Sequence, residues 1–518
     1  MNSVKLFKTF LNTSKLDVIF YTSRHLSQVQ ELKTKTISST RQLINCKRRE
    51  FDLYEGLSYS NYGDNVEVKL ASKGWNHKKS IGDWFILYPR PKNCTTLDDN
   101  RTFEKLGISK HMCHILKSMD ITTPTKIQSK AIPIIFTGKN CIVGAQTGSG
   151  KTLAYLLPMI ERLIAWKKQF DERPMNSPLA VILLPSRELT YQIGEVINHF
   201  ARDFNLNVNV IIGGRTKKMM LNPEFNQSDI VVASLGAISK LTTTGIFRME
   251  NCRHLVLDEA DTLLDDSFYD KLHYFLKHFR LQYGGVNSNA QGTQLTLVSA
   301  TISPNMKEQL NDILPVDSLE EITLNNLHSV MEHVPQKFIR LGRSDKPSHL
   351  LKLIKENQLK KEPVIIFSNK SSTCDWISMF LNSNGINCIN LNGDMSYHIR
   401  SGTFQEFQDG FYDVISCTDI GSRGLDTTRV KHVLNYEFPM HTADYIHRAG
   451  RVGRIGSPDG CYVTNFVSGT KEVEIVQKIE NAIRQNTNIP DVNGNITQVI
   501  SNKMFKSIRN DISNVDRL

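Results

Sequence analysis

The sequence has few of the features that mark membrane, fibrous or disordered proteins. No stretch approaches the ~18–20 uninterrupted apolar residues of a membrane span, so we expect a soluble chain. Its 30 glycines and 17 prolines among 518 residues show neither the period nor the excess of collagen-like or low-complexity chains. Hydrophobic residues make up 40% and charged residues 22% of the chain, which is typical of globular proteins. At this length we expect two sizeable domains with additional tails.

Paired cysteines are also lacking. The nine cysteines contain no Cys-x-x-Cys pair, the spacing that is typical of zinc sites and thiol–disulfide oxidoreductases. Several of them, including Cys141 and Cys417, lie within apolar, strand-like segments. We therefore expect buried, reduced thiols in a reducing compartment, and the spacing does not support a structural zinc site.

Acidic residues are scarce at the N-terminus. Residues 1–50 contain ten Lys or Arg and three Asp or Glu, which accounts for +7 of the net charge of +11. The rest of the chain therefore carries a small surplus, which gives little support for nucleic-acid binding by itself. Residues 1–45 combine Ser and Thr with interleaved apolar and basic residues, as organelle transit peptides do. We expect a transit peptide over 1–45; the alternative is a basic arm that contacts nucleic acid directly.

Two blocks of the chain alternate short apolar runs with amphipathic helical stretches, at 101–323 and 336–486. Strands separated by helices predict α/β domains, each with a mostly parallel sheet flanked by helices. Residues 324–335 are polar and break this rhythm, so we expect a flexible linker there. Residues 46–100 are interpreted as an N-terminal extension without an assigned task, and residues 487–518 as a C-terminal tail. The strands expected from apolar runs are Cys141–Val143, Ala180–Leu184, Val208–Ile212, Ile230–Ala233, His254–Leu257, Leu295–Val298, Val364–Phe367, Cys388–Leu391, Asp413–Cys417, His432–Asn435 and Gly460–Asn465.

The most specific segment reads Ala145-Gln-Thr-Gly-Ser-Gly-Lys151-Thr152 and joins an expected strand to an expected helix. Glycines let backbone N–H groups close around phosphate oxygens, and the helix N-terminus adds positive potential. The lysine is placed to reach the β- and γ-phosphates, and the Thr152 hydroxyl to hold Mg²⁺. The first glycine of the general pattern is replaced by alanine. The expected nucleotide contacts are Ala145, Gln146, Thr147, Gly148, Ser149, Gly150, Lys151 and Thr152.

Two carboxylates follow the apolar run Leu255–Leu257. Buried carboxylates at a strand end are costly unless they serve a cation or a proton transfer. Asp258 is therefore the expected Mg²⁺ partner of the phosphate loop. Glu259 is placed to orient and deprotonate an attacking water molecule. Together with the phosphate loop, this pair predicts hydrolysis of a nucleoside triphosphate.

With Asp258-Glu-Ala-Asp261 in this place, the chain resembles the DEAD-box RNA helicases of superfamily 2 over residues 100–485. The resemblance implies two tandem RecA-like domains, ATP and Mg²⁺ as cofactors, RNA as the partner, and no membrane span. Phe103 and Gln128 resemble the motif that selects adenine, by stacking and by the amide edge. Arg187 and Gly214 resemble its RNA contacts in the first domain. The residues that resemble those coupling hydrolysis to unwinding are Asp261, Ser299, Thr301 and His447.

The second block resembles the second domain of the same family. Arg451 and Arg454 match the arginine fingers, whose charge would stabilise the transition state of phosphoryl transfer. Asp426 resembles the contact to the ATP ribose. The expected RNA contacts in this block are Arg400, Thr418 and Arg423. The resemblance implies that these contacts run along phosphates and sugars, so that sequence preference is weak.

One departure from the family pattern concerns RNA. After the apolar run at 230–233 the chain has Ser234-Leu-Gly-Ala237 where the family has Thr-Pro-Gly-Arg, so the guanidinium expected to meet a phosphate is missing. The sequence therefore predicts that Ala237→Arg would tighten RNA binding. Further departures are Ser186 in the motif of Arg187, Tyr397 for a usual Gln, and Asp120 for a usual Gly.

As a whole, the chain is similar to the mitochondrial RNA helicases of fungi that are associated with assembly of the large mitoribosomal subunit. The resemblance implies a monomer in the mitochondrial matrix that remodels ribosomal RNA or ribonucleoprotein particles. Two alternatives stay open. One is an ATP-gated RNA clamp or scaffold with slow hydrolysis, and the other is a helicase of mitochondrial splicing or translation.

Overall fold

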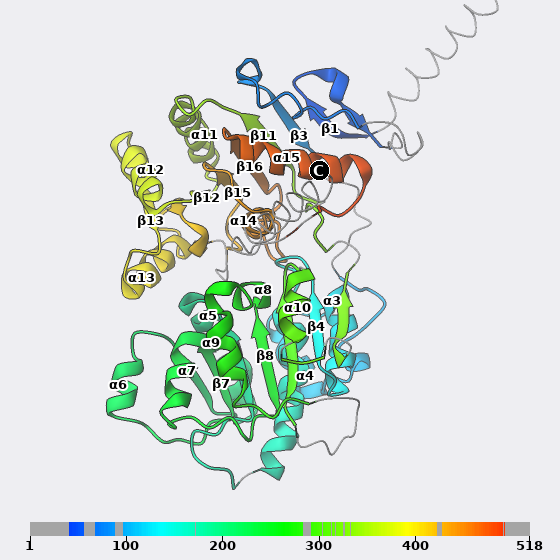
Figure 1. Cartoon of the computed structure of the whole chain (residues 1–518), viewed down its shortest axis with the longest axis vertical. Helices are drawn as coiled ribbons and strands as arrows, with labels where there is room; N and C mark the ends of the chain where they lie inside the picture. The colour runs from blue at the N-terminus through cyan, green and yellow to red at the C-terminus, as the bar shows by residue number, and fades with distance from the viewer. Residues whose placement is uncertain are drawn as a thin grey trace, which may run out of the picture.

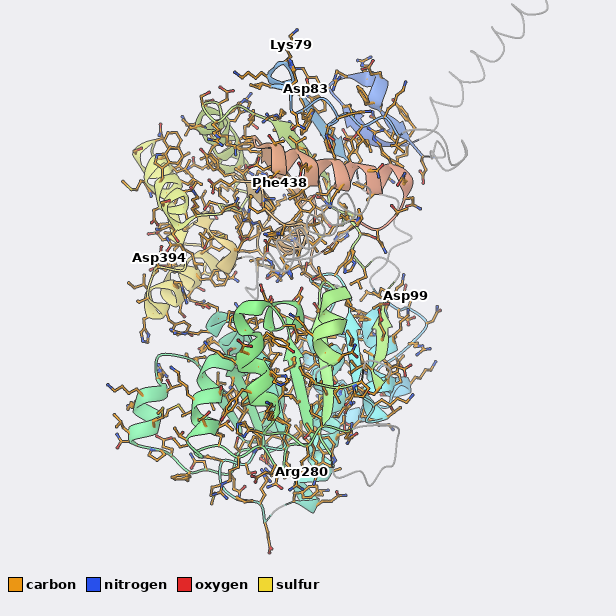
Figure 2. The ribbon with its side chains drawn as sticks, viewed as in Figure 1. Lys79, Asp83, Asp99, Arg280, Asp394 and Phe438 are labelled. Atoms are coloured by element: carbon orange, nitrogen blue, oxygen red, sulfur yellow. The ribbon has the colours of Figure 1, made fainter. Side chains whose placement is uncertain are left out.

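The computed structural model describes residues 41–55, 68–88, 97–170, 172–282, 292–302, 304–311, 313–315, 318–324, 327–331, 333–421, 427–490 and 492. Two α/β domains follow one another along the long axis of the molecule (Figure 1). Figure 2 labels Lys79 near one end of this axis and Arg280 toward the other. Among these described residues no helix is long and apolar enough to cross a membrane.

The first domain is built on a parallel sheet of seven strands in the order β10-β4-β9-β8-β5-β7-β6. Alternate residues of its central strands belong to two different core clusters: Ile182 lies in one, and Val181 and Leu183 lie in the other. Helices therefore bury both faces of the sheet, as parallel sheets require. The strands are β4 (Cys141–Gly144), β5 (Ala180–Leu184), β6 (Val208–Ile211), β7 (Ile230–Ser234), β8 (His254–Asp258), β9 (Gln294–Ser299) and β10 (Glu320–Thr323).

Three helices of the first domain begin at residues whose side chains cap them. The Ser109 side chain caps α2, Ser186 caps α5, and Thr125 with Gln128 forms a capping box at α3. Such caps satisfy backbone N–H groups that lack partners within the helix. The helices are η4 (Glu104–Leu106), α2 (Lys110–Ser118), α3 (Lys126–Phe136), α4 (Lys151–Gln169), α5 (Arg187–Asp203), α6 (Thr216–Leu221), α7 (Leu235–Thr243), α8 (Ala260–Leu263), α9 (Asp266–Leu276) and α10 (Pro304–Asn311).

The second domain has a nine-stranded sheet in the order β13-β14-β12-β15-β16-β11-β3-β1-β2, of which the first six strands are parallel. These six strands are β11 (Gln336–Arg340), β12 (Val364–Phe367), β13 (Cys388–Leu391), β14 (Val414–Cys417), β15 (His432–Asn435) and β16 (Tyr462–Val467). The helices are α11 (Lys346–Lys360), α12 (Ser371–Ser383), α13 (Tyr397–Gln408), η6 (Asp419–Gly421), α14 (Thr442–Ala449) and α15 (Thr470–Gln485). The α/β class and the two parallel sheets are thus as the sequence predicted.

Three N-terminal strands extend this second sheet and correct an expectation from the sequence. They are β1 (Gln42–Cys46), β2 (Leu53–Tyr54) and β3 (Trp84–Leu87), accompanied by η1 (Arg49–Phe51) and η3 (Lys78–Ser80). Strand β3 pairs antiparallel with β11, and β1 pairs antiparallel with β3. The expected boundary at residue 45 falls inside β1. Of the segment expected as a separate extension at 46–100, the described residues 46–55 and 68–88 belong to the second domain, whereas 97–100 lead into the first. We call residues 41–55 and 68–88 the N-terminal lobe.

Buried polar and aromatic contacts fix the N-terminal lobe to the second domain. The carboxylate of Glu480 in α15 accepts hydrogen bonds from the backbone N–H groups of Ala71 and Ser72, at 2.8 and 3.0 Å. Arg484, one turn further on, neutralises Glu480 with a contact of 2.7 Å in the protein interior. On the sheet, the ring of Phe85 stacks on Phe338 of β11 with centroids 4.8 Å apart. Period-2 patterning could not reveal this pairing, because the partners are more than 250 residues apart.

The eight cysteines in the described part of the chain are all buried free thiols, which confirms the expectation of buried, reduced cysteines for this part. Burial raises the pKa of several of them, including Cys46 and Cys141, to about 12. Thiols with such values are protonated near neutral pH and serve as small apolar side chains.

Candidate active site between the two domains

A cavity of about 660 Å³ lies between the domains and is lined by both of them. It is walled by the phosphate loop before α4, the carboxyl ends of β8 and β9, and the helix α14 of the second domain. The carboxyl ends of parallel strands are where α/β proteins place ligands. Predicted site residues that line this cavity are Gln128, Thr147, Gly148, Gly150, Lys151, Thr152, Asp258, Glu259, Ser299, His447, Arg451 and Arg454.

The phosphate loop connects β4 to α4, and two of its glycines have backbone conformations that few other residues adopt. Gly148 and Gly150 have φ angles of 74° and 87°, in the left-handed region. The ammonium of Lys151 lies within the loop and donates hydrogen bonds to the carbonyl oxygens of Ala145 and Gln146, at 2.6 and 2.9 Å. Burial lowers the pKa of Lys151 to about 8, against the opposing effect of nearby carboxylates. A buried cation among backbone N–H groups fits a phosphate.

The two carboxylates follow directly from β8. Asp258 accepts hydrogen bonds from the Tyr155 hydroxyl at 3.0 Å and from the Glu259 backbone N–H at 2.9 Å. Burial raises the pKa of Asp258 to about 6, and the charge of Glu259 adds to this shift. Glu259 has a φ of 51°, and its buried Oε2 has no hydrogen-bond partner within the described chain. A buried carboxylate oxygen without a partner fits a water molecule or a polar substrate group.

The four residues expected to couple hydrolysis to movement lie together. The Thr301 hydroxyl donates a hydrogen bond to Asp261 at 2.5 Å, and His447 Nε2 lies 3.1 Å from the same carboxylate oxygen. Ser299 donates to the Thr301 carbonyl at 2.6 Å, while its own carbonyl accepts from the backbone N–H of Ala145 at 3.2 Å. One chain of contacts therefore runs from the phosphate loop through Ser299, Thr301 and Asp261 to α14.

The segment after helix α14 brings one predicted arginine finger, Arg454, against the phosphate loop and the other, Arg451, to the cavity wall. A Cβ added to Gly148 would lie 2.7 Å from Cγ of Arg454, so the close approach requires glycine at this position. The Thr147 hydroxyl donates to the carbonyl oxygen of Gly450 at 3.3 Å. Arg451 is 2% exposed and lines the cavity. The domains thus touch at the phosphate loop.

At the other end of the cavity, Gln128 joins two motifs. Its amide Nε2 donates to the carbonyl of Gly150 at 3.0 Å, and its Oε1 accepts from the backbone N–H of Thr125 at 2.9 Å. The side chain is 3% exposed and faces the cavity. A ligand base that hydrogen-bonds to this amide would therefore also sense the conformation of the phosphate loop.

The structure places Phe103 differently from the expected stacking position. Its ring is 3% exposed, belongs to the core of the first domain and does not line the cavity. Apolar side chains of Leu97, Met119 and Ile121 line this end instead. Asp120 between the last two has a φ of 59°, which explains why a glycine is usual there in the family pattern.

Two of the predicted RNA contacts in the first domain lie side by side. A Cβ added to Gly213 would lie 2.9 Å from Nε of Arg187, so the guanidinium lies directly on this glycine. The neighbouring Gly214 has a φ of 97°. The loop after β6 and the start of α5 therefore form one surface, with a cation beside exposed backbone.

Arg400 forms an ion pair across the cleft. Its Nη2 lies 2.7 Å from Oε1 of Glu188 in α5, and its Nε donates to the same oxygen at 2.9 Å. Arg400 is 8% and Glu188 is 7% exposed. Sequence reasoning expected Arg400 to contact RNA, whereas its guanidinium is here bound to the other domain. No sequence signal revealed this pair, because its members lie 212 positions apart.

The remaining RNA candidates are only partly described. Thr418 follows β14, and its backbone N–H donates to the carbonyl of Leu391 at 3.2 Å. Arg423 and Asp426 lie outside the described residues.

The departure at Ser234–Ala237 also has a structural explanation. Helix α7 begins at Leu235, and Ala237 is 2% exposed within a core cluster. An arginine at Ala237 would be buried, so the substitution suggested by the family pattern is wrong for this chain. The exposed position at this helix start is Gly236, where an added Cβ meets no atom within 4 Å.

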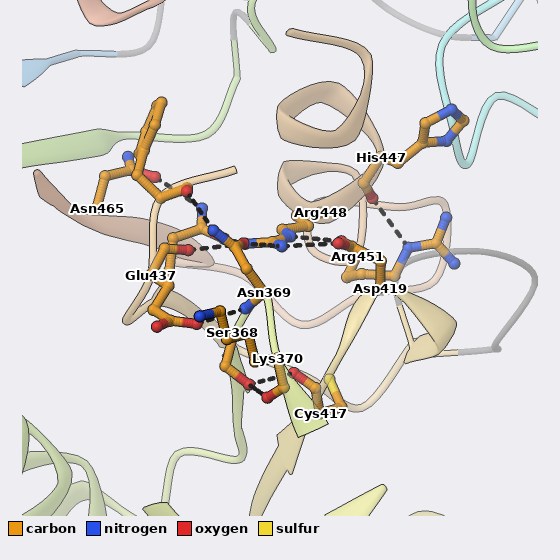
Figure 3. A network of polar contacts seen from close by, with 12 residues as sticks. Ser368, Asn369, Lys370, Cys417, Asp419, Glu437, His447, Arg448, Arg451 and Asn465 are labelled. Atoms are coloured by element: carbon orange, nitrogen blue, oxygen red, sulfur yellow. Dashed lines mark hydrogen bonds and ion pairs between the residues drawn. The ribbon is translucent and has the colours of Figure 1, made fainter. Parts of the chain in front are cut away.

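A buried arginine that was not predicted as a site residue organises the helix of the fingers. Arg448 is fully buried; it contacts both carboxylate oxygens of Asp419 at 2.6 and 2.9 Å and donates to Asn369 Oδ1 at 2.6 Å. It also donates to the carbonyl of Glu437 at 2.8 Å (Figure 3). Arg448 therefore fixes α14 to the loops that follow β12, β14 and β15.

Comparison with known proteins agrees with this geometry. The DEAD/DEAH box helicase model matches residues 125–309, and the helicase conserved C-terminal domain model matches residues 345–456. The human protein described as probable ATP-dependent RNA helicase DDX28 is 36% identical over 472 residues, covering 88% of this chain and 86% of the relative. The mouse relative of the same description is 35% identical and covers 89% and 87%.

Solved structures show the same fold. Dbp5 of Saccharomyces cerevisiae bound to RNA and ADP BeF3 matches with a TM-score of 0.62 and 25% identity, covering 74% of this chain and 94% of that one. Mss116p bound to single-stranded RNA and AMP-PNP matches with a TM-score of 0.62 and 23% identity, covering 77% and 80%. The motifs, the paired sheets and these relatives agree, and the chain belongs to the DEAD-box family of ATP-dependent RNA helicases.

Proposed function

We propose that this helicase hydrolyses ATP in the cavity between its domains and uses the closed arrangement of the domains to hold RNA. This proposal rests on the contact of α14 and the residues after it with the phosphate loop, together with the approach of His447 to Asp261. The same groups would contact the nucleotide and join the two domains, so closure of the domains completes the site.

Each of the proposed site residues has a distinct task. Lys151 binds the β- and γ-phosphates, and Glu259 accepts the proton of the attacking water. Arg451 and Arg454 neutralise charge that develops on the transferred group. Gln128 reads the adenine edge, and the backbone N–H groups from Gln146 to Gly150 bind phosphate oxygens. Asp426 is assigned to the ribose by resemblance alone.

The residues present fit a Mg²⁺ ion. Asp258 offers a carboxylate at the cavity wall, Thr152 offers a hydroxyl, and the partnerless Oε2 of Glu259 leaves room for a bound water. Asp258 and Thr152 would hold the ion, partly through water. When bound, Mg²⁺ supplies positive charge that offsets the phosphates.

Replacing the proposed base tests the catalytic assignment. Glu259→Gln keeps the shape of the side chain but cannot accept a proton. We expect ATP binding to be nearly unchanged and RNA-stimulated turnover to fall at least ~100-fold, the scale of general-base removal. Turnover at the wild-type rate would contradict the role of Glu259, and Glu161→Gln outside the cavity is a matched control.

On the RNA side, Arg187, Gly214, Thr418 and Arg423 are proposed to contact phosphates and sugars of a single strand. Neither Arg187 nor Gly214 lines the cavity proposed for ATP, which supports a separate RNA surface beside it. Crosslinking to uniformly labelled RNA, followed by peptide mapping, checks these contacts.

We further propose action on ribosomal RNA or ribonucleoprotein in the mitochondrial matrix, as a monomer, in assembly of the large ribosomal subunit. Support comes from the transit-like composition of residues 1–45 and from relatives such as the Yarrowia lipolytica protein described as an ATP-dependent rRNA helicase, 32% identical over 361 residues. Importing the full chain and a chain beginning at Arg41 into isolated mitochondria tests the location. Sequencing RNA crosslinked within the organelle identifies the substrate and would equally reveal messenger RNA or introns.

A clamp that hydrolyses slowly is the second candidate, and the buried pair of Arg400 and Glu188 favours it. This pair joins the two domains directly, so it would stabilise the closed state that holds RNA. Rapid ATP turnover and strand release in the presence of RNA would exclude the clamp.

A further inference from the structure

The second domain contains a cavity of its own, of about 560 Å³, at the carboxyl ends of β11, β12, β15 and β16. Strand β12 continues into α12, which packs on one face of the sheet, whereas the neighbouring β15 continues into α14 on the other face. This is a topological switch point, where open α/β sheets leave a crevice for ligands. None of the residues around this cavity lines the cavity between the domains or is a predicted RNA contact.

The interior of this second-domain cavity has unused hydrogen-bonding capacity. Lys346 is 7% exposed, and its ammonium donates one hydrogen bond, at 2.9 Å, to the carbonyl of Tyr436. An ammonium carries three donors, so two remain for a ligand. The buried Oγ of Ser468 on the same wall has no partner among the described residues. Unfilled buried donors of this kind point to a bound polar group.

Charge around the second-domain cavity favours an anion. Arg343 and Lys370 are exposed at the rim and add to the buried charge of Lys346. Two carboxylates also line the wall, which leaves a surplus of one positive charge among the lining residues. These carboxylates have partners of their own: Glu437 accepts from the Asn369 backbone N–H at 2.7 Å and Glu472 from that of Gly469 at 3.0 Å. The N-terminus of the thirteen-residue α12 opens here without a side-chain cap, which adds positive potential.

An aromatic surface lies beside these cations. The Trp376 ring is 40% exposed, and its centroid lies 6.1 Å from Tyr436 and 5.0 Å from Phe380. A planar ring could stack on the open part of the indole while an attached phosphate reached the cations. The volume of the cavity suits a ligand of this size.

We propose that the second-domain cavity binds a phosphate-bearing small molecule with a planar ring, of the mononucleotide class, as a site separate from the ATP and RNA sites. The phosphate is held by Lys346 and Ser468 inside and by Arg343 and Lys370 at the rim. The ring lies against Trp376. The proposal goes beyond the helicase activity and does not depend on which RNA the protein remodels.

Hydrogen bonds connect the walls of this cavity to the helix that precedes the arginine fingers. Asn369 and Glu437, which line it, also hold Arg448 through the contacts of Figure 3. Arg448 belongs to α14, which positions His447 and Arg451. A ligand that stabilises one arrangement of these loops therefore changes the population of finger positions, and with it the rate of ATP turnover.

The experiment uses the full chain with AMP-PNP and Mg²⁺ filling the first site, and uridine 5′-monophosphate and inorganic phosphate as probes. Tryptophan fluorescence follows binding, and Trp376→Phe identifies the reporting residue. Lys346→Met should weaken uridine monophosphate binding at least ~10-fold, because a buried charged contact is lost. Lys352→Met on the same helix is the matched control. Inorganic phosphate alone should bind more weakly than the mononucleotide.

Because Lys346→Met could also disturb the fold, Arg343→Gln combined with Lys370→Gln provides a second variant with exposed positions only. It should weaken the same probe while leaving basal ATP turnover unchanged, and it should remove any effect of the probe on RNA-stimulated turnover. If the probe binds both variants as it binds the unaltered chain, the proposal is wrong. If this double variant instead loses RNA affinity, the cavity is part of an RNA groove and the proposal is equally overturned.

Discussion

At the scale of single residues, the site is set by burial acting on charge. Lys151 and Asp258 have pKa values displaced toward neutrality, to about 8 and about 6, because both lie out of water before a ligand arrives. Their mutual attraction opposes these shifts without cancelling them. A bound anion would therefore favour the protonated form of Lys151.

The lowered pKa of Lys151 predicts that the protein takes up a proton when a nucleotide binds. In the free protein the pKa of Lys151 is about 8, whereas the phosphates of a bound nucleotide return it toward its ordinary value near 10.5. Between these two values the bound form carries more protons, so AMP-PNP binding at pH 9 should take up a proton and weaken as the pH rises above 8. Calorimetric binding in buffers of different ionisation enthalpy measures this uptake. Lys151→Arg, whose charge does not titrate there, should abolish it; uptake that persists in this variant would contradict the assignment.

A second prediction at this scale concerns Arg400 and Glu188. If their buried pair stabilises the closed state, Arg400→Ala and Glu188→Ala should both lower RNA affinity in the presence of AMP-PNP, by about 10-fold or more, as for truncation of one member of a buried pair. If Arg400 instead binds RNA directly, Glu188→Ala should raise affinity, because a competing negative charge is gone. The exchange of both residues, Glu188→Arg with Arg400→Glu, should restore affinity only in the first case.

At the scale of elements, α7 shows that the burial of each position in a motif must be known before a family residue is introduced there. The strand β7 ends at Ser234 and the helix begins at once, so Ala237, the fourth residue of the departure, is buried, and Gly236, the third, is exposed. We expect Gly236→Arg to add a phosphate contact, changing the log–log salt slope of RNA binding by about −0.7. It should also stabilise the chain by up to ~1 kcal/mol through helix propensity. Gly236→Gln separates the two effects, since it should raise the melting temperature without altering the slope.

Most elements of both parallel sheets could be read from the sequence, because buried parallel strands are continuous apolar runs bounded by polar residues. Strands Ala180–Leu184 and Val364–Phe367 were predicted with their observed bounds. The phosphate loop and the carboxylates Asp258 and Glu259 were likewise visible, since each comes at the end of such a run. What escaped prediction depends on distant partners. Strand β1 is short and half-polar, and the aromatic Phe103 gave no sign that its ring turns into the core.

At the scale of the whole molecule, the N-terminal lobe changes how the two domains are joined. The described chain begins on the second domain, enters the first at Leu97, and returns to the second at β11. Leu97 pairs with Thr125 beside Gln128 and lines the cavity between the domains. In Figure 2, Asp99 marks this entry near the junction of the domains. The domains are therefore connected by two covalent crossings instead of one.

The crossing between Tyr88 and Leu97, which adds to the linker at 324–335, limits how far the domains can separate. From Tyr88 at the end of β3 to Leu97, the chain can span at most about 30 Å even when fully extended. A domain pair restrained in this way should close more readily than one joined by a single linker, because less conformational freedom is lost on closure. A specific protease site placed within 89–96 allows the same molecule to be compared before and after cleavage. The N-terminal lobe should stay attached through β3, β11 and Glu480, which gel filtration verifies.

We expect cleavage of this crossing to broaden the distribution of interdomain distances, as measured by energy transfer between a dye on each domain. RNA affinity with AMP-PNP should fall several-fold, while AMP-PNP binding without RNA changes less, because most of the contacts proposed for the nucleotide belong to the first domain. The same protease site placed within 283–291 is the matched control, since both ends of that segment lie in the first domain. Unchanged distances after cleavage would mean that the linker at 324–335 and the contacts of α14 already set the opening. In that case the lobe serves only to cover the exposed edge of β11, where unpaired backbone groups would otherwise be free to pair with another chain.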